Sequence, residues 1–179
     1  MDEIELIWKT IKPLAEKKEY SKKSWLLNEG DVATHLLFIE QGCVRSWFNN
    51  DGDDITFQFF FEGSFVSSFE SLRQGKPSLF NLETIEPSVL HRVHRDVLFT
   101  AAKDLPALKD AVNELLCRRL YHYQKLFLSR IKNSPQRRYE ELLRESPEIL
   151  ERVPHHYIAS YLGITPVSMS RIRNKDKRQ

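Results

Sequence analysis

We expect this chain to fold as an α+β protein, with an N-terminal antiparallel β jelly roll, one long helix and a C-terminal helix-turn-helix. Short apolar runs separated by turn residues fill the chain to about residue 95, as in antiparallel barrels. Apolar residues then recur at steps of three and four, which is the period of a helix. Residues 155–174 have the spacing of two short helices joined by a tight turn. The predicted domains are residues 1–103, 104–133 and 134–179.

Strand signals dominate the first domain. The run ITFQFFF at residues 55–61 alternates apolar residues with Thr56 and Gln58, which is typical of a half-buried strand. Its apolar members are Ile55, Phe57, Phe59 and Phe61. The Asn- and Gly-containing segment 49–54 suits a hairpin turn, because these residues tolerate a positive φ. Four further β-rich runs lie at residues 36–39, 44–48, 79–84 and 89–93.

A long helix is predicted over residues 104–133, with Asp104 as its N-cap and Pro106 in its first turn. The segment Asn133-Ser134-Pro135 ends it and forms a hinge, and residues 136–144 form the next helix. The apolar stripe indicates that the long helix pairs with its copy in a second chain, and packing on its own barrel is the alternative. The predicted dimer contacts are Leu108, Val112, Leu116, Leu120, Tyr123 and Phe127.

The segment HHYIASYLGITPVSMSRIRN at residues 155–174 predicts a helix-turn-helix. Ala159 is small where the two helices cross, and Gly163 supplies the left-handed turn conformation. Thr165 caps the second helix, in which Pro166 fits the first turn and which runs to about Lys175. The expected shared core consists of Ile158, Leu162, Ile164, Met169 and Ile172.

The outward face of the second helix carries basic and small polar side chains, which suit docking in the major groove of DNA. Arginine can donate two hydrogen bonds to guanine, and serine or lysine can hold phosphate. An ordinary helical hairpin is the alternative. The predicted DNA-binding residues are Thr165, Pro166, Val167, Ser168, Ser170, Arg171, Asn174 and Lys175.

Charge is unevenly distributed along the chain. Residues 117–179 contain 14 Lys and Arg against 6 Asp and Glu, a net charge of +8. Residues 1–116 contain 13 against 19, a net charge of −6. A basic C-terminal third on an acidic body indicates contact with a polyanion, although chance clustering on solvated helices gives the same pattern.

The composition excludes several classes of protein. No apolar run approaches the roughly 20 residues of a membrane span, and the acidic start lacks the features of a signal peptide. Two cysteines, Cys43 and Cys117, without metal-ligand spacing predict neither a disulfide framework nor a zinc site. We expect a cytoplasmic protein without a membrane partner.

The chain resembles the Crp/Fnr family of bacterial transcription regulators over nearly its whole length. The similar segments are EGDVATHLLFIEQGCVRSWF (29–48), FEGSFVSSFESLRQGKPS (61–78) and YIASYLGITPVSMSRIR (157–173), and the subtype resembles that of Bacteroidetes. The resemblance implies a cyclic-nucleotide-binding-like barrel and a homodimer on palindromic double-stranded DNA, with RNA polymerase as a further candidate partner.

Departures from the family pattern argue against cyclic AMP as the ligand. Where nucleotide-binding members have a Gly-Glu-Leu segment and an arginine for the cyclic phosphate, this chain has Ser67-Ser68-Phe69 and Ser78-Leu79. Loss of that arginine removes about 1.5–3 kcal/mol of charge-assisted bonding. Cys43 alone cannot supply an iron–sulfur cluster. His91 and His94 lie on opposite strand faces, so they are not expected to bind a haem, and no cofactor is expected.

What remains of the family pocket is apolar with a few hydroxyl groups. It either accommodates an unknown, weakly polar small effector or is filled by its own aromatic side chains. The residues predicted to line it are Phe59, Phe65, Ser67, Ser68, Phe69, Ser78, Leu79, Asn81, Tyr123 and Gln124.

In the recognition helix, Pro166, Val167 and Arg171 match the family's base-reading positions, and only Arg171 keeps the family's residue. Val167 replaces a glutamate, so the operator is expected to differ, with Val167 against a thymine methyl group. The family's β-hairpin wing is not evident after this helix, which predicts lower DNA affinity.

Two other readings remain open. The first is a degenerate cyclic-nucleotide-binding fold that serves as a protein-interaction module without specific DNA binding. The second is a cupin-type metalloenzyme, which would need convergent histidines on one strand face. His91 and His94 have the wrong spacing for that, so an enzyme is not expected.

Overall fold

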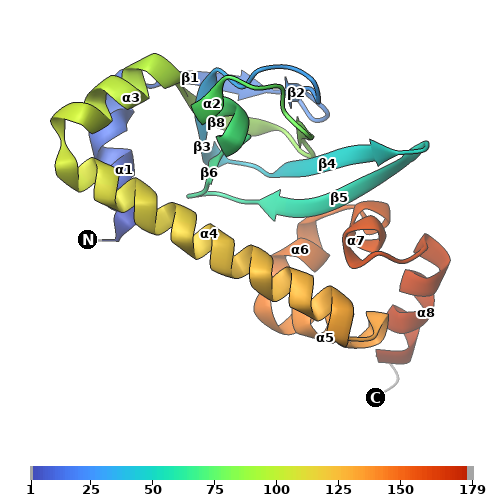
Figure 1. Cartoon of the computed structure of the whole chain (residues 1–179). Coiled ribbons are helices and arrows are strands. Elements are labelled where there is room, and N and C mark those ends of the chain that lie inside the picture. The colour runs from blue at the N-terminus through green and yellow to red at the C-terminus, as the bar shows by residue number, and fades with distance from the viewer. Residues whose placement is uncertain (1, 177–179) are drawn as a thin grey trace. The chain divides into compact units, whose positions relative to one another are not determined.

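The computed structural model describes residues 2–176, with side chains as far as Asn174. The chain divides into two compact units. The first contains the residues up to Ser46 and Phe59–Leu120, and the second contains Trp47–Gln58 and the chain from Tyr121 onward. The boundaries between the units fall inside two continuous elements, a hairpin and a long helix, which can be followed in Figure 1. The predicted domain bounds at residues 103 and 133 stay a prediction.

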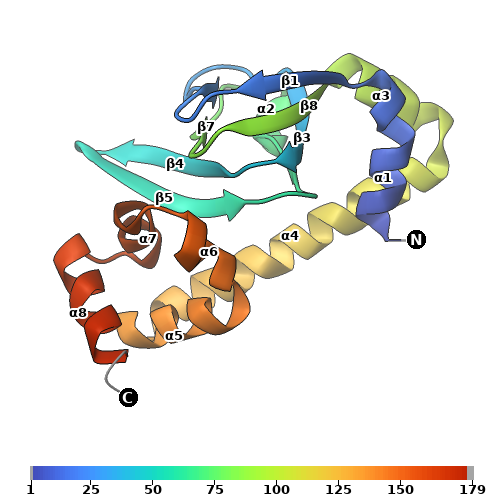
Figure 2. The same ribbon diagram turned by 180° about the vertical axis from the view of Figure 1, so that it is seen from behind.

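The strands form an antiparallel jelly roll, which confirms the predicted barrel. They are β1 (Glu16–Tyr20), β2 (Trp25–Leu27), β3 (His35–Gln41), β4 (Val44–Asn50), β5 (Asp53–Phe60), β6 (Phe65–Val66), β7 (Asn81–Thr84) and β8 (Ser88–His94). One sheet has the order β1-β8-β3-β6 and the other β2-β7-β4-β5. In the first sheet, β8 pairs antiparallel with both β1 and β3, as Figure 2 shows from behind.

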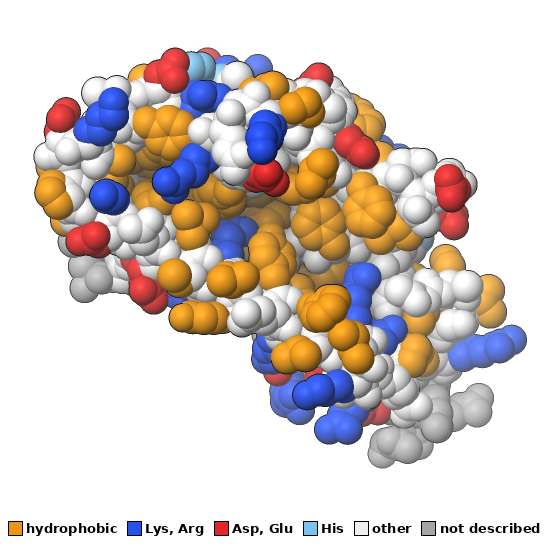
Figure 3. All heavy atoms as spheres, in the orientation of Figure 1, with side chains coloured by type: hydrophobic (Ala, Val, Ile, Leu, Met, Phe, Trp, Pro, Cys, Tyr) orange, Lys and Arg blue, Asp and Glu red, His pale blue; other side chains and the backbone are white. Residues whose placement is uncertain are grey.

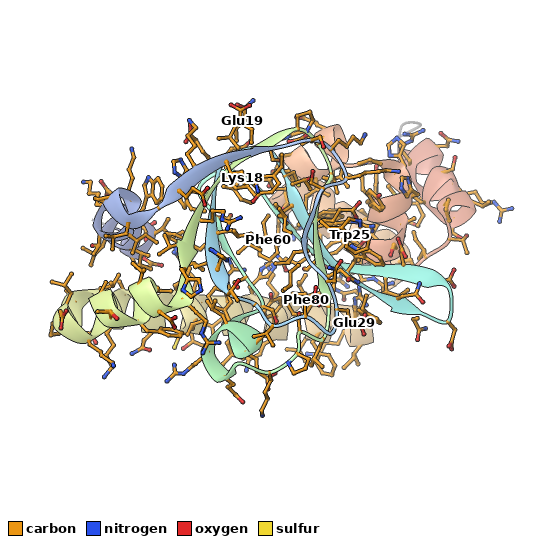
Figure 4. All side chains as sticks on the ribbon, turned by 90° about the horizontal axis from the view of Figure 1, so that it is seen from above. Lys18, Glu19, Trp25, Glu29, Phe60 and Phe80 are labelled. Carbon is orange, nitrogen blue, oxygen red and sulfur yellow. The ribbon has the colours of Figure 1, made fainter. Side chains whose placement is uncertain are left out.

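Two clusters of buried apolar side chains form the core of the first unit. One lies between the two sheets, and its members are Leu37, Ile39, Val44, Phe60, Val66, Leu82 and Leu90. Phe80 packs against this cluster, and Figure 4 shows Phe60 and Phe80 inside the barrel while Glu19 lies at its periphery. The other joins β3, β6 and β8 to the helices through Phe65, Leu98 and Leu108, among others. Full burial of such side chains contributes about 1.5–3 kcal/mol each.

Four helices belong wholly or partly to the first unit. They are α1 (Glu3–Ile11), continued by the 3-10 turn η1 (Lys12–Leu14), then α2 (Phe69–Gln74), α3 (Arg95–Asp104) and α4 (Pro106–Lys132). Asp104 therefore ends α3, and its predicted role as the N-cap of the long helix is wrong. Leu105 separates the helices in an extended conformation (φ −126°, ψ 90°), because the ring of Pro106 disfavours a helical residue before it.

The second unit is a helical domain. It contains the end of α4, α5 (Pro135–Glu145), α6 (Pro147–Arg152), α7 (His155–Leu162) and α8 (Pro166–Asp176), together with the tip of the β4–β5 hairpin. Its buried apolar side chains are Trp47, Tyr139, Leu142, Ile149, Val153, Tyr157, Ile158, Ala159, Leu162 and Met169. Within residues 2–176, no helix combines the length and apolar character that a bilayer crossing requires.

Strand β5 does not show the predicted alternation of buried and exposed residues. Thr56, expected on the polar face, is fully buried, whereas Ile55 and Phe57 are half-buried. The backbone N–H of Thr56 donates to Ser160 Oγ (2.8 Å), and that hydroxyl donates to the Asp54 carbonyl (2.6 Å). Because α7 covers this part of the hairpin, both strand faces are partly shielded and the alternation is lost.

Candidate functional site

The turn between α7 and α8 has the geometry that a helix-turn-helix requires. Gly163 adopts a left-handed conformation (φ 66°, ψ 39°) at the end of α7. Its N–H donates to the Ser160 carbonyl (2.9 Å), and the N–H of Ile164 donates to that of Ala159 (3.0 Å). These two bonds form a Schellman motif, which satisfies the last carbonyls of α7 and redirects the chain into α8.

Thr165 caps α8 as the sequence predicts. Its Oγ1 accepts a hydrogen bond from the Ser168 N–H (3.2 Å) and lies 3.0 Å from Ser168 Oγ. Pro166 begins the helix, where a missing N–H has no cost. On the inner side, Met169 is buried and Ile172 is half-buried, so the inner and outer faces of α8 are clearly defined.

The predicted DNA-binding residues lie mostly on the solvent side of α8 and the preceding turn. Val167 is 60% exposed. Ser168 is half-buried, and Lys175 lies in α8 with its side chain outside the described part. The other members, Thr165, Pro166, Ser170, Arg171 and Asn174, are exposed.

Arg173 differs from Arg171 in its surroundings. Its Nη1 lies 2.5 Å from Nε2 of His155 at the start of α7, and its side chain is half-buried. Arg173 therefore joins the two helices, whereas Arg171 is exposed to solvent. Spacing in the sequence could not separate these roles, because both arginines lie on the same short helix.

A polar network braces the predicted hinge between α4 and α5. Asn133 Nδ2 donates to Glu141 Oε1 (2.7 Å), and Ser129 Oγ donates to Glu141 Oε2 (2.8 Å). Arg138 donates to the carbonyls of Asn133 (2.9 Å) and Leu162 (2.6 Å), which connects α5 to the end of α7. Burial, followed by the nearby Arg130, lowers the pKa of Arg138, which remains a cation because arginine titrates far above neutrality.

Sequence reasoning missed this network. Arg138 and Glu141 lie on α5 and their partners are backbone carbonyls or side chains on other helices. The only local signal is the Asn-Ser-Pro segment, where Ser134 Oγ accepts from the Arg137 N–H (3.3 Å) as an N-cap. The structure therefore makes the joint a braced connection within the second unit.

The polar groups predicted to face a barrel effector bind the barrel's own backbone. Ser67 Oγ donates to the His35 carbonyl (2.9 Å), and Ser78 Oγ to that of Phe80 (2.7 Å). Asn81 Oδ1 accepts from the Glu29 N–H (2.7 Å). Their hydrogen-bonding capacity is thus largely used inside the protein.

The remaining predicted pocket residues separate into different environments. Phe59, Phe65 and Ser68 are buried, whereas Leu79 is 73% exposed and lines neither of the two cavities named next, so its place in a pocket stays a prediction. Ser67 and Phe69 line two different cavities. Tyr123 and Gln124 follow Leu120 and belong to the second unit, so their assignment stays a prediction.

The cavity beside Ser67 has a volume of about 430 Å³ and also borders Asn28, Asp31 and His35. Burial and then the charge of Arg92 lower the pKa of His35, so this imidazole is neutral at neutral pH.

Arg119 is a cation of the first unit that sequence reasoning did not find. Its guanidinium lies over the ring of Phe60 (4.7 Å to the centroid) and that of Phe69 (5.5 Å). It also donates to the Phe65 carbonyl. Cation–π contacts of this kind hold α4 against the barrel. No sequence motif marks Arg119, because its partners come from β5, β6 and α2.

The predicted dimer helix has two different halves. Leu108 is buried in the core of the first unit, so its role as a dimer contact is wrong, and half-buried Val112 packs against the same core. Leu116 is likewise half-buried. Beyond them, α4 exposes a run of large apolar side chains, consisting of Leu120, Tyr121, Tyr123, Phe127, Leu128 and Ile131.

Comparison with known proteins gives a family match for part of the chain and a fold match for nearly all of it. Residues 17–104 match the family model of the cyclic nucleotide-binding domain. The whole chain also has the fold of Crp/Fnr-type transcription regulators. A search among curated proteins finds no significant sequence match. The Bacteroidetes-like subtype stays a prediction.

Three solved structures illustrate this likeness. The c-di-GMP-responsive global regulator CLP of Xanthomonas campestris has a TM-score of 0.78 at 18% identity, covering 97% of this chain and 92% of its own. FixK2 of Bradyrhizobium japonicum has a TM-score of 0.78 at 21% identity, covering 90% and 83%. A protein of Eubacterium rectale assigned to the crp/fnr family has a TM-score of 0.73 at 20% identity, covering 96% and 82%.

Proposed function

We propose that the protein is a homodimeric transcription regulator that binds a palindromic DNA site through α8. The observation that carries the proposal is the exposed face of α8, where Val167, Ser170, Arg171 and Asn174 project from a helix fixed by a Schellman turn and a threonine cap. A projecting helix with an arginine and small polar residues fits the major groove. The net charge of +8 over residues 117–179 supports attraction to phosphate.

A second copy of the chain would complete the assembly. The exposed apolar residues at the end of α4 are typical of a surface that pairs with its own copy. Two recognition helices related by two-fold symmetry would then read half-sites about one helical turn apart. RNA polymerase is the expected downstream partner of such a regulator.

The barrel would work without cyclic AMP. Ser78 and Leu79 replace the phosphate-binding arginine and its neighbour, and Ser78 is committed to the Phe80 carbonyl. We therefore expect cyclic AMP to leave DNA affinity unchanged.

The decisive experiment is selection from a random-sequence DNA pool at two salt concentrations, followed by sequencing of the retained DNA. An enriched palindrome with a steep salt dependence is the expected result. Salt-sensitive retention without any enriched motif would instead favour an interaction module with nonspecific DNA affinity.

A further inference from the structure

The first unit contains an apolar cavity between the barrel and its helices. The cavity has a volume of about 240 Å³, and its walls come from α1, β3, α2, α3 and α4. Leu72, Leu98 and Leu115 form buried walls, and half-buried Phe69, Phe99 and Val112 lie nearer the surface. Figure 3 shows hydrophobic side chains lining a hollow over α2, α3 and the start of α4.

Charge is confined to one side of this cavity. Glu70 and Arg73, both exposed on α2, are the two charged residues among its lining side chains, and the other nine are apolar. An apolar cavity of this kind does not hold ordered water, because water needs two to four polar partners. A cavity of about 150 Å³ accepts benzene, so this one has room for roughly eight to ten carbon atoms.

We propose that this cavity binds a small apolar molecule with a single uncharged polar head group, such as a medium-chain alcohol. The alkyl chain of this ligand lies among Leu72, Phe99 and Leu115. Its head group lies at the rim beside Glu70 and Arg73. A rim with one carboxylate and one guanidinium offers both an acceptor and a donor to a hydroxyl group. A fully charged head group would meet one charge of its own sign there.

The occupant is a small molecule and not a protein partner, because the deepest lining residues are buried. Leu72 lines the cavity but is only 2% exposed, so a flat protein surface cannot contact it. A cyclic nucleotide does not fit either, since its phosphate would enter an apolar cavity without a buried cation. Ser78 and Leu79, which stand at the family's phosphate positions, do not line this cavity.

Occupation of the cavity would act on α4. Val112, Leu115 and Leu116 of α4 form one wall, and Phe69 on the opposite wall also contacts the Arg119 guanidinium. A ligand that orders Phe69 therefore strengthens the attachment of α4 to the barrel. None of its lining residues is a predicted DNA-binding residue, so ligand binding can be measured separately from DNA binding.

Titration of 1-octanol into the full-length protein, followed by calorimetry and thermal unfolding, tests the proposal. We expect saturable binding with one molecule per chain and a rise in Tm. The Val112→Phe variant should bind at least tenfold more weakly, because the added ring fills the cavity. Val97→Phe is the matched control, since Val97 is exposed on α3 outside the cavity, and it should bind as the wild type does.

Two further measurements keep the test decisive. If circular dichroism shows that Val112→Phe does not fold, Leu116→Phe takes its place. In the wild type, nuclear Overhauser contacts between octanol and the Leu115 methyl groups locate the ligand. Absence of saturable binding, or unchanged affinity in the folded cavity-filling variant, would overturn the site. Octanoate or octylamine binding more than tenfold tighter than octanol would overturn the uncharged head group. DNA selection on the same preparation tests the regulator function separately.

Discussion

Gly163 shows how one residue sets the geometry of the recognition helix. Its positive φ allows the two turn bonds to the carbonyls of Ser160 and Ala159. A Cβ at this position would meet the nearest atom, Arg138 Nη2, at 3.9 Å, which is ordinary contact. The requirement for glycine is therefore conformational and not steric, so the sequence alone could predict it.

Replacement Gly163→Ala should lower the free energy of unfolding of the helical unit by about 1 kcal/mol, since an L-residue is strained in the left-handed region. Gly163→Asn should cost less, because asparagine tolerates this conformation. Urea unfolding followed by circular dichroism measures both. Equal stability of the alanine variant and the wild type would show that the turn relaxes without the left-handed residue.

Arg171 should contribute to base recognition once an operator is known. Arg171→Ala should weaken binding by about 1–3 kcal/mol and relax specificity at one base pair. Competition assays on operators changed at single positions would measure this, with exposed Arg144→Ala as the control. A uniform loss on all sequences would identify Arg171 as a phosphate contact.

For the helices and strands, the sequence predicted where most of them lie but not which distant residues they contact. Apolar runs between turn residues located five of the strands, β3, β4, β5, β7 and β8, and the helical period located the long helix. The period-two alternation expected in β5 was wrong, because α7 shields its second face. Pro106 was correctly placed at a helix start, but α3 before it was missed because Asp104 resembles an N-cap. Leu108 and Arg119 depend on contacts with distant strands and helices, which no local pattern encodes.

The α4–α5 joint should respond to pH through Glu145. The hydrogen bond from Lys125 Nζ (2.6 Å) is the main cause that lowers the pKa of Glu145. A lowered folded-state pKa means that this stabilisation is fully present above the ordinary pKa of glutamate and is lost as the pH falls through the lowered value.

Lys125→Met should therefore destabilise the helical unit slightly at about pH 7, by less than about 1 kcal/mol because the pair is exposed. The difference from the wild type should vanish toward about pH 2, where Glu145 is protonated. Urea titrations across this range provide the measurement, with Lys132→Met as the control. A difference that persists in acid would mean that Lys125 acts through packing of its aliphatic stem.

At the scale of the whole molecule, α4 joins the two units and has a different role in each. Its first half, with Leu108, Ala111 and Leu115, is buried in the first unit. Its second half exposes Phe127 (65%) and Ile131, among others, and belongs to the second unit. The exposed apolar surface available for the proposed pairing thus lies in the second half, and the calls for Val112 and Leu116 stay predictions.

Phe127→Glu should convert a dimer into a monomer, because it introduces a charge into the apolar surface of each copy. Sedimentation velocity should show the change, while circular dichroism remains that of the wild type. Lys109→Glu, at the exposed start of the same helix, should leave the dimer intact. A Phe127→Glu variant that sediments as the wild type does would move the pairing surface elsewhere.

The burial of Leu108 and its neighbours by the chain's own barrel also bears on how the cell could use this protein. Because the first unit buries this part of α4 in its own core, that core does not require a second copy of the chain. If chains pair through the second half of α4 as proposed, pairing follows mass action, and the fraction of paired chains rises with the amount synthesised. The expression level of the protein would then determine whether both half-sites of an operator are filled.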